Sequence, residues 1–184
     1  MYVRETPLPG VLIFEPKIYQ DERGLFFESY QVERYREAGI NETFVQDNLS
    51  CSTKDILRGL HYQAQHPQGK LVSVAVGAVF DVCVDLRPGS PTLGQWFGQV
   101  LSDQNHWQMY IPPGFAHGFC VTSEMAVFTY KCTDFYAPQD EYSLRWNDPT
   151  VGIEWPTALP VLSKKDAEAP LWADIRWPDV KMDH

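Results

Sequence analysis

Two strongly polar side chains, Arg58 and His61, interrupt an otherwise apolar stretch at residues 56–63. A guanidinium and an imidazole are costly to bury in such a run unless something pairs with them. An imidazole can exchange a proton near neutral pH, and a forked guanidinium suits anionic oxygens. Taken alone, the stretch favours a core histidine bonded to a backbone carbonyl, and a site for acid–base chemistry is the alternative.

Gly59 lies between the two polar residues. Strict alternation along a strand would place Arg58 and His61 on opposite faces. A glycine permits a bulge that re-aims a side chain, or the close approach of backbone or ligand. If both residues serve one site, the strand must therefore be irregular at this glycine.

The length and composition indicate one globular domain. The chain has 184 residues, of which 44% are hydrophobic and 14% aromatic, and its net charge is −9. This charge argues against nucleic acid as a partner, because no basic face is available for phosphates. No apolar run approaches the length of a membrane span, and the first residues lack a secretory signal. We therefore expect a cytoplasmic protein with no membrane partner.

The elements expected around these residues are nearly all strands. A helix is predicted over residues 31–38, before Gly39, and a short helical patch over 163–169. Many short strands without a βαβ rhythm predict a β-sandwich or barrel. The segment from about 156 to 184 is predicted to be a cap on a single domain spanning 1–184. The expected strands are 11–15, 25–30, 43–48, 56–63, 70–76, 78–86, 95–101, 107–111, 115–119, 125–136 and 142–146.

The spacing Pro112-x-Gly114-x-x-His117 resembles the second sequence signature of the cupin superfamily, a double-sheet jelly roll. The first cupin signature normally supplies two histidines, one residue apart, as metal ligands. Here His61 is followed by Gln63 at the second position. Two histidines alone are a poor metal set, so no metal is expected.

A longer ordered series of motifs is more specific than either signature. The chain resembles the dTDP-4-dehydrorhamnose 3,5-epimerase family, which consists of metal-free cupin-fold enzymes. This resemblance implies a mainly β, double-stranded β-helix (jelly-roll) barrel with short peripheral helices. The motifs, in order, lie at residues 21–24, 26–30, 44–48, 57–63, 68–72, 79–82, 111–119, 146–148, 152–156 and 163–166.

The resemblance implies epimerisation of dTDP-4-dehydro-6-deoxy-D-glucose at C3 and C5, in dTDP-L-rhamnose biosynthesis. The 4-keto group acidifies both hydrogens, so the reaction needs a base, an acid across the ring and a positive group for the enolate. By resemblance, the base is His61, oriented by Asp166, the acid is Tyr130, and Lys70 stabilises the enolate. The ketone of the substrate serves as the electron sink, so no cofactor is expected.

Substrate binding is carried over from the same resemblance. The N-terminal strands of the family pair with a partner subunit, so a homodimer is expected, and Arg23 and Glu28 can serve either subunit's site. The implied contacts are Arg23 and Arg58 to the nucleotide and its diphosphate, Glu28 and Gln46, Asp47 and Asn48 to the thymidine end, His117 and Lys70 to the sugar, Tyr136 stacked on thymine, and Glu141 and Lys165 as further contacts.

Several alternatives remain open from the residues themselves. Asp166 follows Ser163 by three residues and could complete a capping box, Tyr130 could simply line a barrel, and Lys70 could be a solvated strand end. Three other functions fit the same scaffold. They are epimerisation at C3 or C5 alone, non-catalytic binding of a nucleotide sugar, and metal-dependent cupin chemistry.

Overall fold

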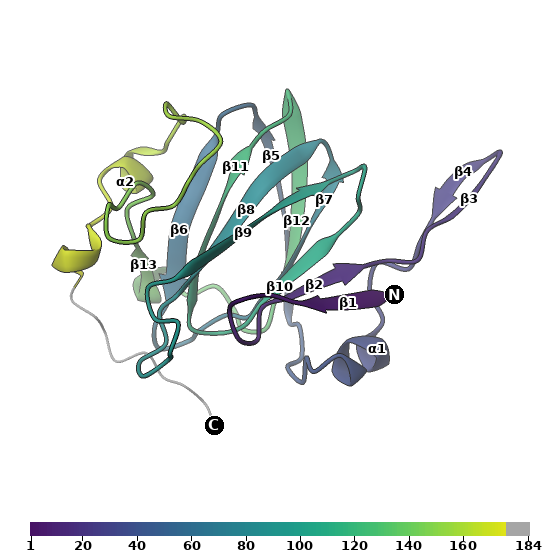
Figure 1. Ribbon diagram of the computed structural model, residues 1–184, viewed down its shortest axis with the longest axis horizontal. Helices are drawn as coiled ribbons and strands as arrows, with labels where there is room; N and C mark the ends of the chain where they lie inside the picture. Colours follow the sequence, from purple (N-terminus) through teal and green to yellow (C-terminus); the bar gives the residue numbers. More distant parts are fainter. Residues whose placement is uncertain (176–184) are drawn as a thin grey trace.

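Short antiparallel strands make up most of the chain (Figure 1). The structure, a computed structural model, describes residues 1–175. In chain order the strands are β1 (Tyr2–Glu5), β2 (Leu12–Glu15), β3 (Tyr19–Asp21), β4 (Gly24–Phe26), β5 (Gln46–Thr53), β6 (Leu57–Gln63), β7 (Lys70–Val76), β8 (Ala78–Asp85), β9 (Trp96–Ser102), β10 (Gln108–Ile111), β11 (Phe115–Val121), β12 (Met125–Cys132) and β13 (Glu141–Ser143). The helices are α1 (Val32–Glu37) and α2 (Lys164–Ala167), with 3-10 turns at Pro138–Asp140 and Trp172–Asp174.

Two large sheets form the barrel. The six-stranded sheet has the order β1-β2-β10-β7-β12-β5, and the five-stranded sheet has the order β13-β6-β11-β8-β9. A separate hairpin, β3-β4, extends away from the barrel (Figure 1). The two antiparallel sheets enclose a shared core, which is the double-sheet jelly roll that the sequence predicts.

Three apolar clusters hold these layers together. The largest lies between the sheets and includes Val72, Met109 and Phe128. A second lies on the outer face of the five-stranded sheet, where Trp155 and Trp172 of the C-terminal segment pack against it. The third joins α1 to the outer face of the six-stranded sheet. The space between the sheets is therefore filled at one end and left open at the other, where polar residues gather.

The helix over residues 31–38 is confirmed as α1. The side chain of Gln31 caps it by accepting a hydrogen bond from the Arg34 backbone N–H at 2.8 Å. The predicted strand 25–30 is wrong beyond Phe26. The Ser29 carbonyl accepts hydrogen bonds from the side chains of Tyr35 and Gln108, so this segment satisfies its backbone outside a sheet ladder.

Other predicted boundaries shift by a few residues. The strand predicted at 43–48 instead begins at Gln46 and continues to Thr53. This strand, β5, pairs with β12 along its whole length. The strand predicted at 125–136 ends at Cys132, after which Thr133 and Gly69 bond each other. The first strand, β1, was not predicted at all.

The predicted helical patch at 163–169 is confirmed as the short helix α2, capped by Ser163. Residues 176–184 of the expected cap lie outside the described residues. Within residues 1–175, neither α1 nor α2 has the length and apolar character needed to cross a bilayer.

Candidate active site

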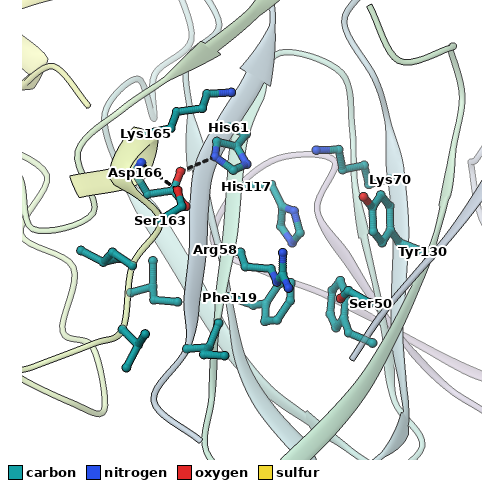
Figure 2. A pocket seen from close by; sticks show the side chains of 15 residues that line it. Ser50, Arg58, His61, Lys70, His117, Phe119, Tyr130, Ser163, Lys165 and Asp166 are labelled. Carbon is teal, nitrogen blue, oxygen red and sulfur yellow. Dashed lines mark hydrogen bonds and ion pairs between the residues drawn. The ribbon is translucent and has the colours of Figure 1, made fainter. Parts of the chain in front are cut away.

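A cavity of about 430 Å³ opens between the two sheets at the polar end of the barrel. Figure 2 shows its walls, with the five-stranded sheet and α2 on one side and the six-stranded sheet on the other. The lining residues are Ser50, Ile56, Leu57, Arg58, His61, Lys70, His117, Phe119, Phe128, Tyr130, Val161, Leu162, Ser163, Lys165 and Asp166. All four residues predicted to be catalytic, His61, Lys70, Tyr130 and Asp166, therefore line one cavity.

An irregularity in β6 brings Arg58 and His61 to the same cavity. His61 pairs with His117 and Arg58 with Phe119, so β6 has one residue more than β11 between these pairs. Gly59 lies in this bulge with φ +118°, and a Cβ there would come within 2.7 Å of two backbone atoms of β11. Only glycine fits without displacing backbone. The strand is therefore irregular at Gly59, as expected if Arg58 and His61 serve one site.

His61 forms a pair with a buried carboxylate. Its Nε2 lies 2.6 Å from Oδ1 of Asp166, whose side chain is 5% exposed. Because an ionised carboxylate only accepts hydrogen bonds, Nε2 carries the hydrogen and Nδ1 is the ring nitrogen left to accept a proton. This arrangement fixes the tautomer and orientation of a histidine base.

Asp166 reaches His61 because of the way α2 begins. The Ser163 hydroxyl accepts a hydrogen bond from the Asp166 backbone N–H at 3.1 Å, and this N-cap places the carboxylate over β6. Burial raises the pKa of Asp166, but hydrogen bonds to His61, Ser163 and the Gly59 backbone outweigh burial and leave the pKa below its usual value. The capping role and the pairing with His61 thus coexist in one residue.

The opposite wall carries Tyr130 and Lys70. Tyr130 pairs with Val72 and Cys132 with Lys70 across β12 and β7, so Tyr130 and Lys70 are diagonal neighbours on one face. Figure 2 shows both side chains across the cavity from His61. Within residues 1–175, neither the phenol nor the ammonium has a hydrogen-bond partner or an ion pair, so both are available to a ligand.

Burial shifts the pKa values of this wall. It raises the pKa of Tyr130, so the phenol stays protonated well above neutral pH. It lowers the pKa of Lys70, while the charges of Cys132, Asp81 and Glu141 act in the opposite direction. The wall therefore offers a proton donor beside a positive charge in a poorly solvated place.

A second histidine–carboxylate pair lies deeper in the same cavity. His117 Nε2 lies 3.0 and 3.1 Å from the two carboxylate oxygens of Asp81, which is completely buried. The sequence predicts His117 as a site residue but assigns no role to Asp81. Two signals mark Asp81, its place in the motif at residues 79–82 and its acidic side chain inside the apolar run of residues 79–84.

A smaller cavity of about 280 Å³ adjoins the first and shares His61, Lys70 and Tyr130 with it. Its remaining lining is rich in amides and hydroxyls, which suit a polar ring such as a nucleobase or sugar. These residues are Gln46, Asn48, Tyr62, Gln63, Gln68, Tyr136 and Glu141.

Glu141 connects the two cavities. It accepts a hydrogen bond from the Tyr136 hydroxyl at 2.9 Å and forms an ion pair with Lys165 of α2. The Tyr136 backbone N–H in turn donates to Gln46 at 2.9 Å. The Gln46 amide nitrogen also donates to Asn48 at 3.1 Å. Hydrogen bonds and one ion pair therefore connect five predicted binding residues at the rim, namely Gln46, Asn48, Tyr136, Glu141 and Lys165.

Gln63 occupies the position where a metal cupin has its second histidine. Its amide nitrogen donates to the carbonyls of His66 and Phe135, and its amide oxygen accepts from the Ala137 backbone N–H at 2.9 Å. The side chain thus fixes the loop that carries Tyr136, and all its hydrogen-bonding groups are used within the protein.

Arg58 projects a free guanidinium face into the larger cavity (Figure 2). Its Nε donates to Ser52 at 3.1 Å, and no carboxylate among residues 1–175 lies within 4 Å of it. A guanidinium without a carboxylate partner suits a phosphate group of a ligand.

Three predicted binding residues lie away from both cavities. Arg23 is on the extended hairpin, where it pairs with Asp21, and Glu28 pairs with Arg34 near α1. Asp47 lies on the outer face of its sheet and pairs with Lys131 at 3.0 Å. The other predicted catalytic and binding residues line one or both cavities.

The arrangement fits chemistry in which protons are exchanged on both faces of one small molecule. A histidine with a carboxylate partner stands on one wall, and a protonated phenol with an ammonium stands on the other. These are the groups that a carbon acid next to a carbonyl requires, namely a base, an acid and a charge for the enolate.

Comparison with known proteins agrees with this chemistry. A family model described as dTDP-4-dehydrorhamnose 3,5-epimerase matches residues 5–174. The dTDP-4-dehydrorhamnose 3,5-epimerase of Salmonella typhimurium is 57% identical over 174 residues, which are 93% of this chain and 95% of that protein. The enzyme of the same name from Neisseria gonorrhoeae is 50% identical over 98% of this chain, which spans 57% of that longer protein.

A solved structure is similar over nearly the whole chain. It is the dTDP-6-deoxy-D-glucose-3,5-epimerase of Legionella pneumophila in complex with dTDP-4-keto-L-rhamnose, with a TM-score of 0.92, 56% identity, and coverage of 95% of this chain and 94% of that chain. The resemblance seen in the sequence is thereby confirmed. Because the family model covers nearly the whole chain and relatives of this similarity share its fold, the chain belongs to the dTDP-4-dehydrorhamnose 3,5-epimerase family.

Proposed function

We propose that this chain epimerises dTDP-4-dehydro-6-deoxy-D-glucose at C3 and C5 to give dTDP-4-dehydro-L-rhamnose. The observation that supports this most is the position of His61 and Tyr130 on opposite walls of one cavity, with Lys70 beside the tyrosine. An epimerase must remove a proton from one face of a carbon and return one to the other. A single-sided site would return the proton to the face it left.

The proposed reaction begins at the ring nitrogen that Asp166 leaves free. His61 Nδ1 removes the hydrogen from C3 or C5, and the electron pair moves onto the C4 oxygen as an enolate. Asp166 stabilises the imidazolium that forms, and the ammonium of Lys70 stabilises the enolate oxygen. Tyr130 then donates its proton to the opposite face, and solvent restores the protonation of both residues. The steps repeat at the second carbon.

The reaction involves no oxidation or reduction, since each carbon loses one proton and regains one proton. The ketone of the substrate holds the electron pair in the intermediate, so the mechanism uses no added cofactor. A positioned acid or base contributes about 10²–10⁴ in rate. The remainder is assigned to the fixed charges and to orientation of the sugar.

Nucleotide binding is proposed for the rim of the site. Arg58 binds the diphosphate through its unpaired guanidinium face, and Tyr136 stacks on the thymine ring. Gln46 and Asn48 supply amides that suit the polar edge of a base. Glu141 and Lys165 complete the contacts, and Asp47 contributes through its backbone because its side chain faces the other way.

A second copy of the chain is proposed to complete the site. Arg23 and Glu28 lie on or next to an extended hairpin, away from their own cavity, and the aromatic side chain of Phe26 there is 70% exposed. Such a projecting, apolar segment suits docking against a second subunit. The proposed assembly is a homodimer in the cytoplasm in which these residues contact the partner's substrate.

Isotope uptake tests the function directly. The purified protein is incubated with the substrate in heavy water, and the product is examined by NMR. Deuterium at both C3 and C5 supports double epimerisation, whereas label at one carbon means epimerisation at that carbon alone. His61→Ala and Tyr130→Phe should each abolish product formation, and exposed His66→Ala should not. A non-catalytic binding protein would produce no label with any of the four proteins.

A further inference from the structure

Lys70 and His117 line the larger cavity, and the Asp81 side chain contacts His117 from behind that lining. Lys70 begins β7, Asp81 lies in β8 and His117 lies in β11. The His117 side chain is 8% exposed and that of Asp81 is not exposed at all. Asp81 lines neither cavity, so it does not meet a ligand there, and any role in the reaction must pass through its neighbours.

The hydrogen bonds of Asp81 fix one of these neighbours. Both of its oxygens lie within 3.1 Å of His117 Nε2, and no other hydrogen bond to its side chain occurs within residues 1–175. A carboxylate accepts and does not donate, so His117 carries its hydrogen on Nε2 and its Nδ1 is an acceptor. Asp81 therefore determines the tautomer of a histidine that lines the cavity.

The charge of Asp81 acts on the other neighbour. Burial lowers the pKa of Lys70, and Asp81 is among the charges that raise it again. Burial also lowers the pKa of His117, which keeps the imidazole neutral and leaves Asp81 as the counter-charge under the cavity. Burial raises the pKa of Asp81, and His117 and Lys70 offset only part of this rise.

We propose that Asp81 is a positioning residue for the epimerase reaction, which keeps Lys70 in its ammonium form and holds His117 in the Nε2–H tautomer. This inference rests on the proposed function, in which Lys70 stabilises the enolate. A neutral amine would supply no charge to that oxygen, so the reaction would slow as Lys70 lost its proton.

Asp81→Asn is the first variant, because asparagine keeps the size and one acceptor oxygen but removes the charge. We expect kcat at neutral pH to fall roughly tenfold to hundredfold, less than the 10²–10³ typical when a direct donor to the oxyanion is lost. The basic limb of the kcat profile should move to lower pH, since the lost charge had raised the pKa of Lys70. KM should change little, and Asp81→Glu should restore the limb.

Other titratable groups that face Lys70 can contribute to the same pH profile. They are Cys132 and Tyr130 of β12, Asp81 of β8, His117 of β11, His61 of β6 and Glu141 of β13. A double-mutant cycle isolates the effect through Lys70. If Asp81 acts through it, Asp81→Asn should cost much less kcat in a Lys70→Met background than in the wild type.

Asp85→Asn is the matched control. Asp85 is a buried carboxylate on the same strand, but it bonds the turn residues Arg87, Ser90 and Thr92 rather than the cavity. It should lower stability and leave the basic limb where it is. A limb that moves equally in both variants would mean that Asp81 has only a structural role.

A measurement on the unaltered protein covers the case in which Asp81→Asn does not fold. Nitrogen-15 NMR of the histidine rings should show His117 neutral, with its hydrogen on Nε2. A hydrogen on Nδ1 would overturn the proposal. If the wild type takes up deuterium at C3 and C5 while Asp81→Asn keeps the wild-type basic limb, this inference fails and the proposed function stands. If the wild type takes up no label, the proposed function itself fails.

Discussion

Neighbouring groups give two facing histidines different chemistry. His61 and His117 pair directly across β6 and β11, and each has a carboxylate on its Nε2. The His61 side chain is 28% exposed and reaches both cavities, whereas that of His117 is 8% exposed. Burial lowers the pKa of His117, which suits a neutral hydrogen-bonding role. His61 is thus the better placed of the two to exchange protons with a substrate and with solvent.

Asp166→Asn tests the partner of the base. The amide can present N–H to Nε2 and favour the wrong tautomer, so kcat should fall about 10²–10⁴-fold with little change in KM. Steady-state kinetics measure this effect. Lys164→Ala, at the exposed neighbouring position on α2, serves as the control and should keep wild-type kinetics. A kcat within about threefold of wild type for Asp166→Asn would contradict the role of the dyad.

Single elements of the fold are shaped to present these residues. The β6 bulge points two polar side chains into one cavity, and the cap of α2 places the Asp166 carboxylate beside His61. The β8–β9 connection is held by Asp85, which accepts hydrogen bonds from Arg87, Ser90 and Thr92. In each case a short-range feature of the chain determines where a polar side chain points.

Gly59→Ala tests the bulge. Both the positive φ and the contacts of 2.7 Å with β11 oppose a side chain, so we expect a loss of a few kcal/mol in the free energy of unfolding and a lower kcat from a displaced His61. Gly89→Ala has φ +78° but nothing within 4 Å of the added Cβ, and it should cost about 1 kcal/mol without affecting kcat. Urea unfolding and kinetics compare them. Equal effects in both variants would mean that the bulge does not position the base.

Asp85→Asn tests the turn by its pH dependence. Hydrogen bonds from Arg87, Thr92 and Ser90 outweigh burial and lower the pKa of Asp85 from 3.8 to about 2. A carboxyl group whose pKa is lower in the folded state than in the unfolded state stabilises the fold at pH values above its unfolded pKa. This stabilisation is lost as the pH falls through the folded-state pKa. The variant should be about 2 kcal/mol less stable at neutral pH, with the difference narrowing below pH 3.8. A constant difference from pH 7 to pH 3 would contradict this origin.

Local patterns predicted most elements but not every pairing. The irregularity at Gly59 followed from two polar residues that needed one face, and α1 followed from its helix formers and Gly39. The end of the strand at Phe26 did not, because the Ser29 carbonyl beyond it is bonded by the side chains of Tyr35 and of Gln108, the second of which lies far along the chain. Likewise, His61 and Asp166 lie 105 positions apart, so only the family resemblance connected them before the structure did.

The fold places the proposed acid and the proposed base on different sheets. His61 belongs to the five-stranded sheet and Tyr130 to the six-stranded sheet, and the jelly roll keeps the two walls apart while both face one cavity. The hairpin with Arg23 projects away from this barrel (Figure 1). If Arg23 contacts the partner's substrate, as proposed, a complete site forms only when two copies of the chain meet.

Mixed dimers test that expectation. Arg23→Ala and His61→Asn should each be nearly inactive alone. If Arg23 serves the partner's site, a mixed dimer has one site with both residues intact. Random assortment after co-refolding should then restore roughly a quarter of wild-type activity, because half of the dimers are mixed. No recovery in mixtures that form dimers would place Arg23 in its own subunit's site.

Hydrogen exchange by Tyr130→Phe most directly tests the opposed acid and base. In heavy water this variant should return recovered substrate that carries deuterium at C3 or C5 with its original configuration, because His61 still removes and returns protons on its own face. His61→Asn should give no exchange. Epimerised product from Tyr130→Phe at near wild-type rate, or exchange by His61→Asn, would contradict the assignment of these residues to opposite faces of the sugar.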